Sequence, residues 1–495
     1  MLVLGLLVLV VHDVGYVLGH PFWVDESWVA VTTRFPATQL PATTSATPIG
    51  WSVVLRGFTL GGGQTSRLLP LAFAGAAVAI AYWFARRLDW ARPEASVIAG
   101  VLSGLGVLLV PAMLVRNDLK QYTADACMAL LVLALLSRVE RVWSRRGLFA
   151  LSVAVWGGML FSHTVVFVGV AAFAAICLVQ LVARKWDRLI DAVVAATSTA
   201  VLMLLVYLTF DARAVGAGLT AYWNGFYLPV AQGAQASVSF VMSRFDALHV
   251  YFGLGPAWLA VGLVVAGVVT IFRLGRPATA LTFVLLWPVM LGVSAFKKYP
   301  FLDLRTSTFL FAVTVVVAAI GVTGLWSLLR PLFRGVVSAG LVAAAVVAFA
   351  VHAQPYLRQQ TSPAENVRDQ ARYVAAHAEH GDVTLVNLSS NWGFAYYWPI
   401  GHPSRRPNAA VLQGYEAYFP DQPSVVVAAN RNAAGVDSAL AEARARALHH
   451  RGARIWLVRS HVNTVEQAAW DAALRRDGLT AKSIGSDGLA LIQLG

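Results

Sequence analysis

Long apolar runs, almost free of charged residues, recur along most of this chain and limit what it can fold into. A run of roughly 20 apolar residues is long enough to cross the hydrocarbon core of a membrane as a helix. Charged residues make up only 13% of the 495 residues, against about 25% in soluble globular proteins. The sequence therefore predicts a polytopic α-helical membrane protein and excludes disordered, collagen-like and disulfide-stapled chains.

Eleven apolar runs are predicted to span the membrane. The first of them contains His12 and Asp13, and no small-residue cleavage site follows it. We therefore expect an unprocessed first span here and not a signal peptide. The runs cover approximately residues 2–19, 69–86, 97–114, 123–137, 147–161, 164–182, 189–210, 251–272, 279–296, 306–328 and 335–353.

The distribution of Lys and Arg predicts how the chain is oriented. These residues concentrate in five short loops between alternate runs, of which 138–146 is the richest, and positive charge beside spans marks the cytoplasmic side. The long first loop at 20–68 and the region after the last run are then predicted to be extracytoplasmic. Basic residues outnumber acidic residues by 38 to 25, but because the excess lies among the apolar runs it indicates membrane orientation and not nucleic-acid binding.

The region 355–495 differs from the transmembrane module predicted at 1–354. No Gly-rich phosphate loop follows any of its expected strands, which argues against nucleotide binding. Its aromatic stretch at 392–398 fits a domain core or a membrane contact somewhat better than a sugar-stacking surface. The region is predicted to be an extracytoplasmic α/β domain, with strands at 382–388, 424–428, 453–458 and 489–494 and helices at 363–380, 437–450 and 464–476.

The first outer loop begins HPFWVDESWVAVTTR and carries an adjacent acidic pair, Asp25 and Glu26. Carboxylates close to hydrocarbon are costly, and a like-charged neighbour adds to that cost. The pair therefore favours a functional site over ordinary solvated loop carboxylates. Trp23 and Trp28 on either side of it are typical of side chains that anchor a protein at the membrane surface.

Two further outer segments, RNDLKQYTAD at 116–125 and KKYPFLDLR at 297–305, place cations on the side where positive charge is disfavoured. Such clusters suit an anionic ligand, although snorkelling cations explain them equally well. His163 lies in a minimal outer turn and fits a helix cap as well as a substrate pocket. The candidate residues of the two segments are Arg116, Asp118, Lys120, Tyr122, Lys298 and Arg305.

The eleven-span layout, the Asp-Glu pair in the first loop and the terminal outer domain resemble the GT-C superfamily of polyprenyl-phosphate-dependent glycosyltransferases. This superfamily includes protein O-mannosyltransferases, the aminoarabinose transferases that modify lipid A, and mycobacterial envelope arabinosyl- and mannosyltransferases. VDESW, DLKQYTADA and YPFLDLRTSTFLF are similar to the first-loop, second-loop and late-loop patterns of its bacterial O-mannosyltransferase-like members.

The resemblance implies an inverting glycosyltransferase of the cell membrane. It would move a sugar from a polyprenyl-phosphate donor to an extracytoplasmic glycan, lipid or protein acceptor. Asp25 would be the general base, and Glu26 would orient the acceptor or help Asp25 to hold a divalent ion such as Mg²⁺ or Mn²⁺, a point that stays open. The remaining residues divide into a donor phosphate site, with Arg116, Lys120, Tyr122, Lys298 and Arg305, and a substrate pocket, with His163 and Asp118.

Two alternatives of other classes stay open at this point. A transporter or flippase of lipid-linked envelope precursors would need charged sites near the bilayer midplane, usually with internal repeats. The sequence contains few mid-span charges and no visible repeat. A non-catalytic scaffold that presents residues 355–495 is the third interpretation.

Overall fold

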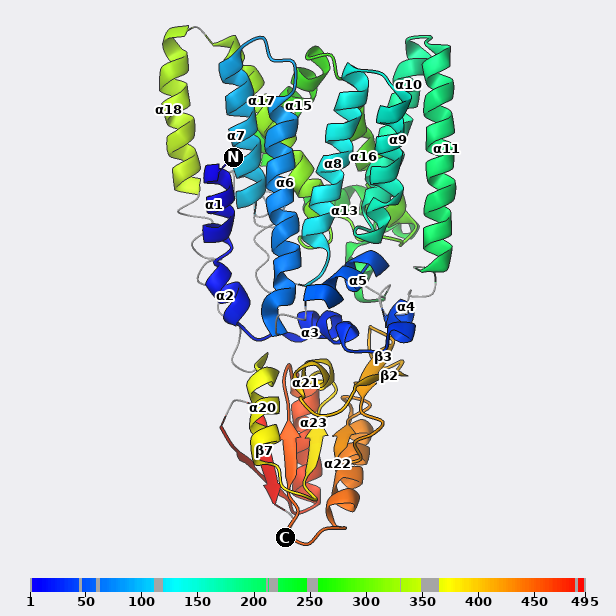
Figure 1. Cartoon of the computed structure of the whole chain (residues 1–495), viewed down its shortest axis with the longest axis vertical. Coiled ribbons are helices and arrows are strands. Elements are labelled where there is room, and N and C mark those ends of the chain that lie inside the picture. Colours follow the sequence, from blue (N-terminus) through cyan, green and yellow to red (C-terminus); the bar gives the residue numbers. More distant parts are fainter. Residues whose placement is uncertain are drawn as a thin grey trace.

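The fold has two parts, a bundle of long helices and a smaller α/β region at one end of it (Figure 1). Short helices of the first long loop (residues 20–68), including α3 (Val24–Ala30), α4 (Leu40–Thr43) and α5 (Ile49–Phe58), lie between them. This computed structural model describes residues 2–43, 47–58, 63–110, 119–210, 212, 221–246, 257–329, 331–348, 365–485 and 488–493.

Helices occur at all eleven predicted runs, which confirms the polytopic helical class. Among the described residues, six helices are long and apolar enough to cross a membrane, namely α6, α8, α10, α11, α16 and α17. The helices of the bundle after the first run are α6 (Leu68–Arg86), α7 (Pro93–Leu109), α8 (Tyr122–Arg141), α9 (Arg145–Trp156), α10 (Val165–Val182), α11 (Trp186–Thr209), α15 (Ala257–Arg273), α16 (Pro277–Ala295), α17 (Thr308–Leu328) and α18 (Pro331–Ala348).

The first predicted run is broken into α1 (Leu2–Val11) and α2 (Val14–Gly19). Asp13 between them has a φ of 43°, in the left-handed region that a continuous right-handed helix excludes. The run at 147–161 is also interrupted, because α9 ends before Gly157 and a short 3₁₀ turn, η6 (Gly158–Leu160), follows. In both places the apolar run predicted one continuous helix, whereas the structure has shorter helices with a break between them.

Helix α17 is the central helix of the bundle and contacts α7, α8 and α15. Its approach to α15 depends on two glycines, since a Cβ atom on Gly267 would lie 1.9 Å from the Val317 carbonyl oxygen. A Cβ atom on Gly321 would lie 2.1 Å from the Leu263 carbonyl oxygen. Small residues allow membrane helices to pack closely, and here they allow the close approach of α15 and α17.

Short elements in two long loops connect the helices of the bundle. In the first loop they are η1 (Val31–Thr33), η2 (Ala37–Gln39) and η4 (Gly63–Arg67). Between α11 and α15 they are η8 (Asn224–Phe226), η9 (Val230–Gln232) and α13 (Ala234–Asp246).

The α/β region contains a five-stranded sheet in the order β4-β1-β5-β7-β6 and a separate β2–β3 hairpin. Strand β1 is parallel to β4 and β5, while β7 is antiparallel to β5 and β6. The elements are α20 (Val367–His377), β1 (Val383–Val386), α21 (Asn391–Tyr397), β2 (Ser404–Pro407), β3 (Tyr415–Tyr418), β4 (Val425–Val427), α22 (Ala433–Ala447), β5 (Ile455–Val458), α23 (Thr464–Arg476), β6 (Thr480–Ser483) and β7 (Leu489–Gln493).

All four predicted strands and all three predicted helices of this region are present, which confirms its α/β class. The hairpin, α21 and β6 were not predicted. Strand β6 has the sequence TAKS and is exposed along its length, so it lacks the apolar alternation that indicates a strand. The predicted boundary at 354/355 lies outside the described residues.

The first long loop and the α/β region share one hydrophobic core. Phe22 and Trp51 of the loop belong to the same buried cluster as Trp392 and Tyr415. Most of the aromatic stretch 392–398 is buried there, which confirms the core interpretation over a sugar-stacking surface. A second core, with Leu385, Leu440 and Trp470 among its members, lies within the α/β region itself. The loop and the α/β region therefore form one packed layer on the bundle.

Candidate active site

The acidic pair lies in the first turn of α3. Negative charge is favourable at the amino end of a helix, and a carboxylate oxygen of Glu26 accepts a hydrogen bond from the Trp23 backbone N–H at 3.4 Å. Successive residues of a helix point about 100° apart. Asp25 and Glu26 consequently reach different partners, although they are neighbours in the sequence.

Asp25 meets both predicted cationic segments. Its Oδ2 atom lies 2.8 Å from Nη1 of Arg305 and 3.4 Å from Nζ of Lys120. The Asp25 side chain is 24% exposed. Burial raises the pKa of Asp25, but the charges of Lys120 and Arg305 outweigh that effect and hold the pKa below its ordinary value. Asp25 is therefore ionised at neutral pH and can accept a proton.

The tryptophans beside Asp25 hold the two cations that pair with it. Nζ of Lys120 lies 4.9 Å from the centre of the Trp28 ring, and the Arg305 guanidinium lies 5.9 Å from the centre of the Trp23 ring. Both distances are in the range of cation–π attraction. These rings were predicted to anchor the chain at the membrane surface, and the structure shows that they also contact the two cations beside Asp25. In the sequence, only the position of the two tryptophans on either side of Asp25 indicated that they lie at the same site.

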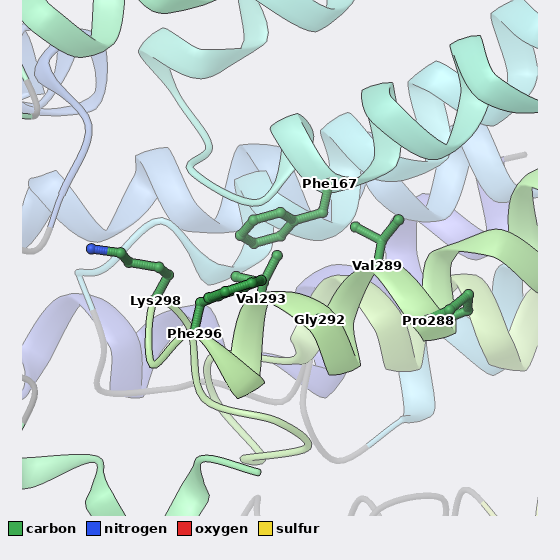
Figure 2. A pocket seen from close by; sticks show the side chains of 7 residues that line it. All are labelled: Phe167, Pro288, Val289, Gly292, Val293, Phe296 and Lys298. Carbon is green, nitrogen blue, oxygen red and sulfur yellow. The ribbon is translucent and has the colours of Figure 1, made fainter. Parts of the chain in front are cut away.

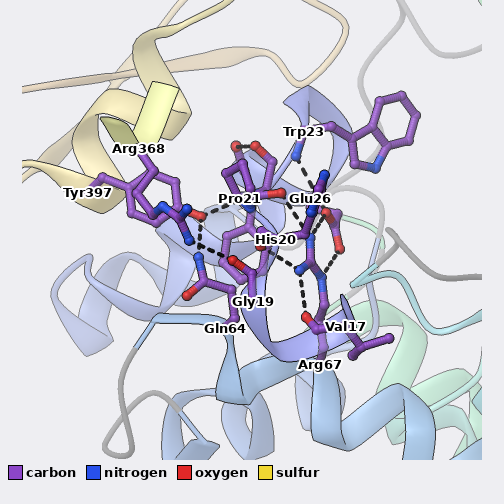
Figure 3. Close-up of polar contacts among 12 residues, drawn as sticks. Val17, Gly19, His20, Pro21, Trp23, Glu26, Gln64, Arg67, Arg368 and Tyr397 are labelled. Atoms are coloured by element: carbon purple, nitrogen blue, oxygen red, sulfur yellow. Dashed lines mark hydrogen bonds and ion pairs between the residues drawn. The ribbon is translucent and has the colours of Figure 1, made fainter. Parts of the chain in front are cut away.

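Glu26 pairs with Arg67, which is not among the predicted site residues (Figure 3). Nε and Nη2 of Arg67 donate to the two carboxylate oxygens of Glu26 at 2.8 and 2.5 Å. The remaining donors of Arg67 reach the carbonyl oxygens of Val17, His20 and Pro21 at 2.7 to 3.1 Å. All five N–H groups of the guanidinium are therefore used.

The placement of Glu26 gives no support to its predicted roles. Glu26 is fully buried, and its carboxylate already balances Arg67, so it is not available to orient an acceptor. Asp25 and Glu26 also fail to fit a shared metal site, because each carboxylate is paired with cations and the two face different partners. Within the part of the chain that the structure describes, no group of three or more His, Cys, Asp or Glu side chains could hold a metal ion.

The loop between α16 and α17 carries Arg305 and Lys298. A carboxylate oxygen of Asp303 shapes this loop by accepting hydrogen bonds from the backbone N–H groups of Arg305 and Thr306 at 3.1 and 3.0 Å. The Tyr299 hydroxyl donates to the Thr306 carbonyl oxygen at 2.9 Å. The loop is thereby fixed internally, and it directs Arg305 toward α3.

Lys298 stands apart from the contacts of Asp25 and lines an open groove beside α10 and α16 (Figure 2). The groove has a volume of about 590 Å³. Its other lining residues are apolar, namely Phe167, Pro288, Val289, Gly292, Val293 and Phe296. A long apolar surface with one cation at its polar end suits a lipid that carries an anionic head group.

The structure also describes two of the remaining predicted site residues, Tyr122 and His163. Tyr122 is buried at the first position of α8, and His163 is half-buried in the turn before α10. Burial lowers the pKa of His163 to about 4, so its imidazole is neutral at pH 7. Arg116 and Asp118 lie outside the described residues.

The architecture is that of a polytopic membrane protein with the GT-C fold, as predicted. Among solved structures, the chain is similar to ArnT from Cupriavidus metallidurans in the apo state, at 16% identity and a TM-score of 0.57. It is also similar to ArnT bound to undecaprenyl phosphate, at 14% identity and a TM-score of 0.58. Each match covers 99% of this chain and 97% of ArnT.

A third similar structure is the archaeal oligosaccharyltransferase AglB from Archaeoglobus fulgidus, in complex with an inhibitory peptide and a dolichol-phosphate. This match has 12% identity and a TM-score of 0.54, and it covers 92% of this chain and 68% of AglB. No protein-family model and no curated protein sequence matches the chain. At these identities the likeness establishes the fold alone.

Proposed function

We propose that this chain is a membrane glycosyltransferase that moves a sugar from a polyprenyl-phosphate donor to a hydroxyl group of an extracytoplasmic acceptor, with inversion. The observation that carries the proposal is the convergence of Lys120 and Arg305 on Asp25. This reaction needs a base for the acceptor hydroxyl and positive charge for the departing phosphate. The two structures of this fold that contain undecaprenyl phosphate and dolichol-phosphate support a lipid phosphate as the carrier.

In the proposed reaction, the acceptor oxygen forms a bond to the anomeric carbon and its proton passes to the Asp25 carboxylate. The bond between the anomeric carbon and the phosphate oxygen breaks, and the polyprenyl phosphate leaves with the electron pair. Lys120 and Arg305 neutralise its charge. When donor phosphate draws these cations away from Asp25, their effect on its pKa weakens while burial still raises it, which makes Asp25 a stronger base.

The apolar groove beside α10 and α16 is the proposed path of the polyprenyl chain. Lys298 at its polar end would then meet the phosphate, in the role that the resemblance implies. Arg116 and Tyr122 stay assigned to the phosphate site, and Asp118 and His163 to the substrate pocket, as predictions. We assign Glu26 a structural role, in which its ion pair with Arg67 holds α3 in place, and no role in the reaction.

The proposed orientation puts Asp25 on the outer side of the cell membrane. Arginine-rich loops meet at one end of the bundle, where Asp89 pairs with Arg141 at 3.4 Å and with Arg276 at 2.6 Å. At the starts of α9 and α11, Nε of Arg145 lies 3.0 Å from Oδ1 of Asp191. Because α8 runs from the site at Tyr122 to this end at Arg141, the arginine-rich side lies opposite α3. The positive-inside rule then favours a cytoplasmic position for these loops and an outer position for the site.

The proposal can be tested by binding and turnover of the full chain in lipid nanodiscs. We expect undecaprenyl phosphate to bind more tightly than undecaprenol, which has the same chain without the phosphate. A variant with Lys120→Met and Arg305→Met should lose about tenfold or more of that affinity, because hydrogen bonds to charged groups contribute about 1.5–3 kcal/mol. Lys482→Met, on the exposed strand β6, is the control.

Turnover is measured as the release of undecaprenyl phosphate from synthetic undecaprenyl-phosphate sugars in the presence of envelope extract. Equal affinity for undecaprenyl phosphate and undecaprenol would contradict the phosphate site. Binding of the phosphate without release of any sugar from a broad donor panel would contradict the transferase and favour a carrier for the lipid.

A further inference from the structure

Two histidines meet at the end of the α/β region that lies away from the helical bundle (Figure 1). Helix α20 begins beside α2, where Nη1 of Arg368 donates to the Gly19 carbonyl oxygen at 2.8 Å. From there it leads to the turn that carries His380 and precedes β1. The turn at 448–454, between α22 and β5, carries His450. Because β1 and β5 are parallel neighbours, the turns that precede them lie side by side.

The rings of His380 and His450 are in contact. Their centres lie 5.1 Å apart, and their planes are almost perpendicular, at 89°. Gly381 allows this close approach, because a Cβ atom on it would lie only 2.6 Å from the Cβ atom of His450. Gly381 also has a φ of 96°, which glycine adopts readily and other residues do not.

Both turns are fixed by their own hydrogen bonds. The Asp382 backbone N–H donates to the Glu379 carbonyl oxygen at 3.1 Å, and the Ala453 backbone N–H donates to the His450 carbonyl oxygen at 3.2 Å. Oδ1 of Asp382 accepts a hydrogen bond from the Arg454 backbone N–H at 2.8 Å, which joins one turn to the other. The backbone therefore holds the two histidines near each other.

The surroundings of the two rings leave them open to a cation. Both histidines are exposed, and among the described residues no hydrogen bond or ion pair engages either ring. The Arg454 guanidinium is balanced by Glu379 at 3.0 Å and by Asp382 at 2.8 Å. Arg451 is exposed, so water weakens its repulsion of a nearby cation.

We infer that His380 and His450 form a binding site for a divalent transition metal ion of the late first row, such as Zn²⁺ or Cu²⁺. Imidazole nitrogen is a preferred ligand of these ions. In a tetrahedral site each nitrogen lies about 2.0–2.1 Å from zinc, which places the centres of two ligating rings about 5 Å apart. The two rings already have this separation.

The site has two protein ligands. Within the part of the chain that the structure describes, no group of three or more His, Cys, Asp or Glu side chains could hold a metal ion. Water is therefore expected to fill the remaining positions, so the ion should exchange more readily than in a closed structural zinc site. This inference does not depend on the proposed function, and it places no metal at Asp25 and Glu26.

Metal titration of the full chain in nanodiscs tests this site, with a chain and a scaffold that carry no polyhistidine tag. Calorimetry should show saturable binding of Zn²⁺, and Cu²⁺ should bind more tightly than Zn²⁺. Mg²⁺ prefers oxygen ligands and should not compete. His380→Ala and His450→Ala should each lower the Zn²⁺ affinity at least about tenfold, because one of two ligands with a high effective concentration is lost.

Two exposed histidines serve as controls. His402→Ala, in the loop between α21 and β2, should bind Zn²⁺ like the wild type. His449→Ala tests whether the neighbour of His450 is the true ligand. Thermal unfolding of each variant at the wild-type temperature shows that any loss of binding is not a loss of fold.

The electron paramagnetic resonance spectrum of bound Cu²⁺ gives a second readout. It should show nitrogen coupling from both rings in the wild type and from a single ring in His380→Ala or His450→Ala. The inference is overturned if Zn²⁺ shows no saturable binding, or if both of these variants keep the wild-type affinity. It is also overturned if His449→Ala loses as much affinity as His450→Ala.

Discussion

Nη1 of Arg305 lies 2.8 Å from Oδ2 of Asp25, although 280 positions separate the two residues in the chain. Lys120, which is 95 positions from Asp25, reaches the same oxygen atom. Three segments that lie far apart in the sequence therefore meet at one carboxylate. These contacts show which of the acidic and basic residues of the three segments lie close together, and most of the predictions below depend on them.

Replacement of Asp25 by Asn should remove the proposed base and leave the fold intact. We expect transfer from an undecaprenyl-phosphate sugar to fall by at least about a hundredfold, in the range that general base catalysis contributes. Asp421→Asn, at an exposed loop position of the α/β region, is the matched control. Near-normal turnover of the Asp25 variant would rule out this residue as the base.

The pH dependence of transfer should change when a cation beside Asp25 is removed. The base must be ionised, so activity is lost as the pH falls through the pKa of Asp25, which Lys120 and Arg305 hold below its ordinary value. Lys120→Met raises that pKa. The acid limb of the kcat/KM profile should therefore move to higher pH, while Lys482→Met should leave it in place. A shift to lower pH, or no shift, would contradict the assignment.

Arg67 should be important for stability through its buried pair with Glu26. Removal of one partner of a buried ion pair leaves an uncompensated charge and costs about 3–5 kcal/mol. We expect Arg67→Met to lower the thermal unfolding temperature strongly. The double variant with Glu26→Gln should recover part of the loss, because no buried carboxylate is then left unpaired. A double variant that is as unstable as the single one would argue against the pair.

Arg34 should fix the α/β region onto the first loop. Its guanidinium donates to the carbonyl oxygens of Ala395, Tyr396 and Trp398 at 2.7 to 2.8 Å, which would otherwise be unsatisfied at the end of α21. In Arg34→Ala, limited proteolysis should release the α/β region faster than in the wild type. Arg372→Ala, at an exposed position of α20, should not change the rate.

Chelation should leave transfer unchanged if the acidic pair does not bind a metal. The carboxylate of Glu26 is balanced by Arg67 and that of Asp25 by Lys120 and Arg305. EDTA treatment followed by a transfer assay should therefore show no loss of activity. Loss of activity that Mg²⁺ or Mn²⁺ restores would indicate that the site binds a metal ion, and it would contradict the structural role of Glu26.

Much of the fold was predictable because the signals for it are local. A helix in a membrane requires one continuous apolar stretch, so the runs predict the helices without knowledge of how they pack. Four strands and three helices of residues 365–493 also follow from short-range patterns, whereas the β2–β3 hairpin, α21 and β6 do not. The breaks at Asp13 and after Trp156 were missed, since a single left-handed residue or a pair of glycines barely changes the hydropathy of a run.

The sequence by itself determined that the chain is a polytopic membrane protein and that Asp25 lies in the loop after the first apolar run, among aromatic residues. Only the tertiary structure decided that Lys120 and Arg305 reach Asp25 while its neighbour Glu26 pairs with Arg67. The physical reason is that helix geometry sends adjacent side chains in different directions. Their partners, from segments far away in the chain, depend on how the helices pack and not on any local pattern.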